Sequence, residues 1–131
     1  MNSKTIVLAF GVTLLLIGIV GFFMKPVFGI FAVDTFHNLV HLLSGILAMA
    51  LAMKSMKGAE IFARVFGVMY GLVGILGFVF SDGKIFGVLT INTADNILHI
   101  LLALAFLFAG FSKAKSMPET PVASIHPPPA Q

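Results

Sequence analysis

Long apolar runs alternate with short polar stretches along the chain. The four runs cover residues 5–24, 35–53, 61–80 and 93–111, and each is 19 or 20 residues long. About 20 residues at a rise of 1.5 Å cross the roughly 30 Å hydrocarbon layer of a bilayer. Only helices and closed barrels satisfy their own backbone there, and the short alternating segments of a barrel are absent. The pattern therefore predicts an all-α membrane protein with four transmembrane helices.

Composition agrees with this pattern. The chain is 59% hydrophobic and 10% charged, whereas a soluble domain carries about 25% charged residues. The first run is too long for the apolar region of a signal peptide and no small-residue cleavage pattern follows it, so we expect a mature helix there. The chain has no cysteine, which excludes disulfides and thiolate metal sites.

Two stretches of the first half recur in the second half. FGVTLLLIGIVGFF (10–23) corresponds to FGVMYGLVGILGFV (66–79), and FGIFAVDTFHNLVHLLSG (28–45) corresponds to FGVLTINTADNILHILLA (86–103). Each copy contains two helices, so both copies enter the membrane in the same direction. We therefore predict a parallel duplication of a two-helix unit.

The predicted repeat units span residues 5–53 and 61–111. Two β-prone segments, 29–34 and 87–92, precede the second helix of each unit. A pseudo-twofold axis would pair these segments antiparallel, as a short two-stranded lid on the outer end.

Lysine and arginine distinguish the two ends of the helices. Only Lys25 and Lys84 lie in the outer loops, while the other six lie near the termini and the middle loop. By the positive-inside rule, both termini are expected in the cytoplasm. The net charge of +3 thus reflects topology, and no basic stripe for nucleic acid is present.

Polar residues gather near the predicted outer ends of the second and fourth helices. Asp34 and Asn92 are suited to N-cap these helices. Asp34, His37 and Asp95 form a predicted outer polar cluster, which two caps and an acid in a first helical turn explain without a metal. The i, i+4 spacing of His37 and His41 suits a ligand pair, but the missing Glu removes the zincin interpretation and makes zinc a minor alternative.

Two Asn-His pairs lie deeper in the same helices. Asn38 and His41 share one helix face, as do Asn96 and His99. The favoured interpretation is that each imidazole bonds to the Asn of the other copy as interhelical glue. The alternatives are ligation of haem or a metal by His41 and His99, and a proton or quinone role.

Three hydroxyl groups are expected near the membrane midplane. Counting residues from the outer helix ends places Thr13, Ser44 and Tyr70 at similar depth. Because the Tyr70 hydroxyl needs a partner in an apolar layer, we predict Ser44 or Thr13 within hydrogen-bond reach.

FGIFAVDTFHNLVHLLSGILAM, residues 28–49, resembles the signature of a family of small bacterial four-span membrane proteins known only as a domain of unknown function. The likeness extends over about residues 5–111. It implies four spans in a bacterial cytoplasmic (inner) or thylakoid-type membrane, and brings no activity, substrate or cofactor. In the second copy, Asp95 stands at the position of His37.

These observations divide the chain into a transmembrane domain, residues 1–111, and a Pro-rich tail, residues 112–131, expected to be disordered in the cytoplasm. The favoured function is a non-enzymatic structural or accessory component of a membrane complex or homo-oligomer, without a cofactor. A haem- or metal-binding protein that uses His41 and His99 is the alternative, and a small-molecule transporter is the third.

Single cysteines test the predicted orientation, since the chain has none of its own. Lys25→Cys and Lys84→Cys should react with a membrane-impermeant maleimide in intact cells. Lys57→Cys should react only after permeabilisation, because the middle loop is expected inside. The reverse pattern of labelling would contradict the charge argument.

Overall fold

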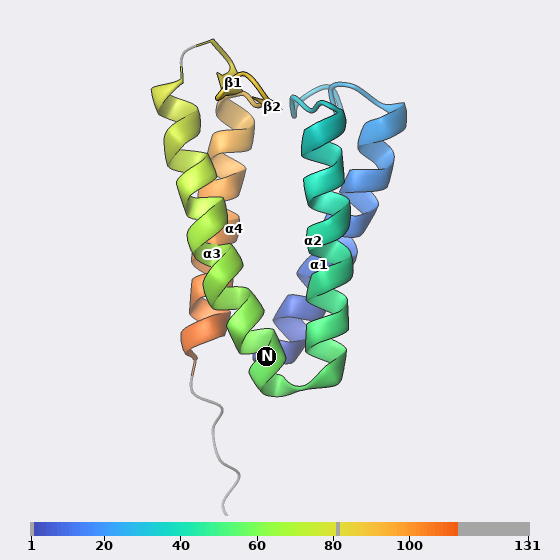
Figure 1. Cartoon of the computed structure of the whole chain (residues 1–131), viewed down its shortest axis with the longest axis vertical. Helices are drawn as coiled ribbons and strands as arrows, with labels where there is room; N and C mark the ends of the chain where they lie inside the picture. The colour runs from blue at the N-terminus through green and yellow to red at the C-terminus, as the bar shows by residue number, and fades with distance from the viewer. Residues whose placement is uncertain (1, 81, 113–131) are drawn as a thin grey trace, which may run out of the picture.

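Four long helices make up most of the computed structural model, which describes residues 2–80 and 82–112 (Figure 1). All four are long and apolar enough to cross a membrane, and large apolar side chains cover their outward surfaces. The predicted four-span, all-α fold is confirmed, and the chain is a multi-pass membrane protein. The predicted disordered tail lies outside the described residues, apart from Ser112. The helices are α1 (Ser3–Phe23), α2 (Thr35–Lys54), α3 (Met56–Val79) and α4 (Thr93–Phe111).

The helices form two antiparallel pairs, α1 with α2 and α3 with α4, which lie side by side (Figure 1). Along the chain, Ser55 is the single residue that connects the two pairs, and it is both the C-cap of α2 and the N-cap of α3. Its hydroxyl oxygen accepts the Gly58 N–H at 2.9 Å. α3 therefore begins at Met56, five residues before the apolar run, because a good N-cap lets the helix start in the polar segment.

Glycines bring the backbones of each pair into close contact. A Cβ atom at Gly45 of α2 would lie 2.6 Å from the Leu15 nitrogen of α1, and one at Gly74 of α3 would lie 2.9 Å from the Asn96 carbonyl oxygen of α4. Such spacing leaves no room for a side chain. Small residues below the Asn-His pairs, on the same helix faces, predict inward seams on α2 and α4. These seams are buried: Ser44, Gly45, Ala48 and Ala52 on one helix, and Ala103, Phe106 and Gly110 on the other.

Aromatic rings fill the space between the pairs. Phe106 of α4 is fully buried, and its ring centroid lies 5.2 Å from that of Phe10 on α1 and 5.6 Å from that of Phe62 on α3. The end of the bundle where α1 begins and α4 ends is called the inner end, after the expected orientation, and the opposite end is called the outer end. At the inner end, the Ser3 hydroxyl donates to the Ala109 carbonyl at 2.6 Å. The two pairs are thus held together along their inner halves.

Each outer loop folds back on itself. In the second loop, β1 (Lys84–Ile85) pairs antiparallel with β2 (Leu89–Thr90), and in the first loop Val27 bridges Phe31. A small two-stranded sheet is therefore present at the outer end. The expected pairing between the two copies is wrong, because each strand finds its partner within its own loop.

The turns explain this local pairing. Phe28 and Gly29 have φ angles of 51° and 72°, and Phe86 and Gly87, 58 positions later, have the same values. Left-handed backbone reverses the chain within a few residues, and glycine adopts it without strain. The two loops thus share one turn geometry.

Close packing at glycine generates a stability prediction. Gly45→Ala should lower the free energy of unfolding by about 1–3 kcal/mol, because the new methyl group meets α1 backbone. The control is Gly71→Ala, whose Cβ would meet Ala103 at 3.4 Å, and it should change stability by less than about 0.5 kcal/mol. Unfolding in detergent micelles measures both, and equal losses would contradict the packing argument.

Candidate functional site

Two carboxylates attach each helix pair to the outer loop of the other pair. Asp34 accepts the His37 N–H of its own helix and the Thr90 N–H of the second loop, both at 2.7 Å. Asp95 accepts the Asn92 N–H and, from the first loop, the Ala32 N–H, both at 2.9 Å. The pairs are therefore crosslinked at the outer end by charge-assisted hydrogen bonds.

These contacts confirm both predicted caps. Asp34 caps α2, and the Asn92 side chain caps α4 by accepting the Asp95 N–H at 3.0 Å in a capping box. Burial raises the pKa of Asp34, but hydrogen bonds from Thr90 and His37 outweigh it, so the pKa lies below its ordinary value of 3.8. Asp34 is therefore ionised at neutral pH and bonds best in that form.

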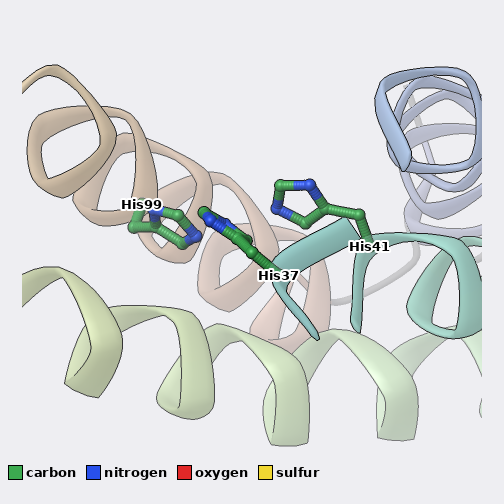
Figure 2. Close-up of side chains that lie close together, drawn as sticks. All are labelled: His37, His41 and His99. Atoms are coloured by element: carbon green, nitrogen blue, oxygen red, sulfur yellow. The ribbon is translucent and has the colours of Figure 1, made fainter. Parts of the chain in front are cut away.

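Three histidines meet at the outer ends of α2 and α4. His37, His41 and His99 are buried, and one ligand-type nitrogen of each lies within 4.8 Å of the others. Figure 2 shows the His37 ring between those of His41 and His99. The α2 and α4 backbones stay more than 8 Å apart, so the imidazoles meet in the space between the helices.

Backbone carbonyls fix two of the three rings. His37 Nδ1 lies 2.9 Å from the Thr90 oxygen, and His99 Nδ1 lies 2.7 Å from the Asp95 oxygen. A carbonyl only accepts, so each Nδ1 must carry a proton, and in the neutral form of each ring the lone pair is then on Nε2. His37 Nε2 is buried and has no hydrogen-bond partner within residues 2–80 and 82–112.

The expected bonds from these histidines to Asn38 and Asn96 are wrong. Asn38 lies against Gly21 of α1, and in the part of the chain that the structure describes the buried oxygen of each Asn side chain has no hydrogen-bond partner. The physical reason is rotation, because residues at i and i+3 differ by about 60° around a helix. Each Asn thus faces its own pair, while the His faces the other pair.

The predicted hydrogen bond near the membrane midplane has a different outcome for Tyr70, Ser44 and Thr13. Tyr70 faces inward, 4% exposed, and its ring centroid lies 5.4 Å from that of His99. Ser44 lies beside the Tyr70 hydroxyl, which has no hydrogen-bond partner among the described residues. The choice of Thr13 is wrong, because this exposed residue bonds to the Ala9 carbonyl of its own helix at 3.0 Å.

A cavity of about 90 Å³ adjoins the histidines between α1 and α4. His41, His99 and Asp95 form part of its wall, and the rest of the wall is almost entirely apolar. The sequence placed His37 in an outer cluster with two acids and missed its contact with His99. The signal in the sequence was the i, i+4 spacing of His37 and His41, but the sequence did not show that His99 is the third member of the cluster.

Comparison with known proteins places this site within one family. A family model described as a domain of unknown function, DUF4383, matches residues 4–112. The chain belongs to the DUF4383 family. The matched region contains all three clustered histidines and both crosslinking carboxylates. No curated protein and no solved structure matches the chain.

The crosslink at Asp34 generates a pH-dependent prediction. Asp34→Ala should lower the free energy of unfolding by about 1 kcal/mol at neutral pH, since a helix cap is lost. A depressed folded pKa contributes stability above the unfolded value of 3.8, and this is lost as the pH falls through the lower folded value. The difference between wild type and variant should therefore shrink in acid.

A matched control separates the crosslink from a general loss of charge. The Asp82 carboxylate accepts the Lys84 N–H of its own loop at 3.1 Å. Asp82→Ala should lower the free energy of unfolding less than Asp34→Ala does, because it removes no contact between the pairs. Unfolding measured between pH 3 and about pH 7 in micelles compares the two, and equal profiles would contradict the role given to Asp34.

Proposed function

We propose that this membrane protein binds a divalent transition-metal ion, of the Zn²⁺ type, through His37, His41 and His99. The observation that carries the proposal is the convergence of three buried imidazole nitrogens within 4.8 Å. Three imidazoles suit Zn²⁺ and its neighbours in the first transition row. The interpretation of His37 as part of a separate outer cluster is replaced by this grouping.

The geometry needs only a small closing movement. Tetrahedral zinc with bonds of about 2.0–2.1 Å places its ligand nitrogens about 3.3 Å apart. Side-chain rotation of His41, whose Nδ1 bonds to none of the described residues, supplies part of the difference. His37 and His99 are already oriented by carbonyls, as metal-bound histidines are in other proteins. Neutral imidazole is the form of histidine that binds a metal ion.

Two carboxylates near the cluster favour a cation at this depth. Asp95 lines the cavity beside His41 and His99. Asp34 bonds to the Thr90 N–H, and the carbonyl of that same residue accepts from His37. Ionisable groups within membrane spans are costly and typically serve a functional site. Negative charge at these positions offsets part of the cost of a divalent ion.

The arrangement favours a small ion over haem. The His37 ring centroid lies 4.4 Å from that of His41 and 5.5 Å from that of His99. A macrocycle between His41 and His99 would need the space that His37 occupies. A structural or accessory role and a transport role have no comparable observation behind them, although a metal protein can also belong to a larger complex.

We further infer that the chain arose by duplication of a two-helix unit, with both termini in the cytoplasm of a bacterial cytoplasmic or thylakoid-type membrane. The shared turn geometry of the two loops and the charge distribution support this. The metal would then lie near the outer face. The second copy carries Asp95 where the first carries His37, so the duplication would supply three ligands and one acid.

Metal content tests the proposal directly. Protein purified without an affinity tag and loaded with Zn²⁺ should retain about one ion per chain, as measured by mass spectrometry of the metal. Its free energy of unfolding should rise by about 2.7 kcal/mol when the free Zn²⁺ concentration is 100 times the Kd. His37→Ala should lose both. Leu43→Ala, at an exposed site of the same helix, is the control. A wild-type chain that retains no more zinc than His37→Ala would overturn the proposal.

A further inference from the structure

The cavity beside the histidines has a mostly apolar wall that includes two of the three histidines. Its sides are built by α1 and α4, and by the end of the first outer loop. His41 and His99 line it, whereas His37 does not. The cavity therefore touches one side of the three-histidine cluster. The residues of its apolar wall are Phe10, Leu14, Ile17, Phe31, Val33, Leu98 and Leu102.

The cavity opens sideways toward the surface of the helices. Thr13 of α1 and Leu98 of α4 line it and are both exposed, Leu98 at 39%. These helices are membrane spans, so their exposed faces meet lipid. A molecule dissolved in the bilayer would reach the histidines through this opening without crossing an aqueous surface.

An ion held by three histidines keeps a fourth position. Structural zinc sites close that position with a fourth protein ligand, whereas reactive sites leave it to water or substrate. Among the described residues, the three histidines are the only group of metal-ligating side chains close enough to share one ion. One carboxylate oxygen of Asp95 already accepts hydrogen bonds from the backbone N–H groups of Ala32 and Asn92.

We propose that this fourth position faces the cavity and accepts the oxygen of a membrane-soluble, neutral, linear molecule: an alkyl chain that ends in a hydroxyl or aldehyde group. The inference rests on the metal site proposed above. Alcohol and carbonyl oxygens are ordinary ligands of zinc. The apolar walls take the chain, and the metal takes its single polar end.

Size and charge define this ligand class. A cavity of about 150 Å³ binds benzene, so the 90 Å³ present here suits a chain end better than a ring. The almost entirely apolar wall disfavours an anionic head such as a carboxylate, because burying a charge in apolar surroundings is costly. A neutral oxygen meets neither obstacle.

Cobalt gives a readout at the metal itself. The protein, in lipid nanodiscs, is loaded with Co²⁺, whose visible absorption reports its ligands, and the bound cobalt is quantified separately. Addition of 1-octanol should shift the absorption in a saturable manner. Octane, which has the same chain without the oxygen, should leave it unchanged. Absence of bound cobalt would count against the metal site; bound cobalt with an unchanged spectrum would overturn only the open position.

Two tryptophan variants test the route. Leu98→Trp fills the mouth of the cavity and should abolish the 1-octanol shift while cobalt remains bound. Leu101→Trp carries the same substitution on the same helix at a position 58% exposed and outside the cavity wall, and it should keep the shift. A shift that persists in Leu98→Trp, or disappears equally in both, would overturn entry through this cavity.

Discussion

Hydrocarbon offers no hydrogen bonds, so a polar side chain within a span is stabilised by the partners that it finds inside the protein. The outer third of this bundle is organised by that constraint. Asp34 and Asp95 use their oxygens on backbone N–H groups of both helix pairs. His37 and His99 use Nδ1 on carbonyls. The same contacts thus fix the orientation of two of the three clustered imidazoles.

Packing at the inner end makes this outer organisation possible. Glycine contacts fix the geometry within each pair, and the rings around Phe106 fix one pair against the other. Toward the outer end the α2 and α4 backbones stay more than 8 Å apart. That separation suits two imidazoles from α2 and one from α4, whereas closer helices would have room only for small side chains.

The departures from symmetry lie at the candidate site. His37 donates to the Thr90 carbonyl, while Asp95, at the corresponding position of the second copy, accepts the N–H of Ala32, the counterpart of Thr90. The two loops therefore receive opposite hydrogen bonds from equivalent helix positions. One half of the chain thus carries an imidazole at this position and the other half a carboxylate, and the metal site proposed above would use both.

The sequence by itself determined the four spans, their order, the caps at Asp34 and Asn92, and the buried small-residue seams, because each depends on local composition and on helical periodicity. It did not determine which half the β-prone segments pair with, since the reversal at Phe28 and Phe86 depends on backbone conformation. Nor did it unite His37 with His99. Spacing along one helix shows which residues share a face, but the distance between faces of different helices is set by how the pairs pack, and only the tertiary structure decides that.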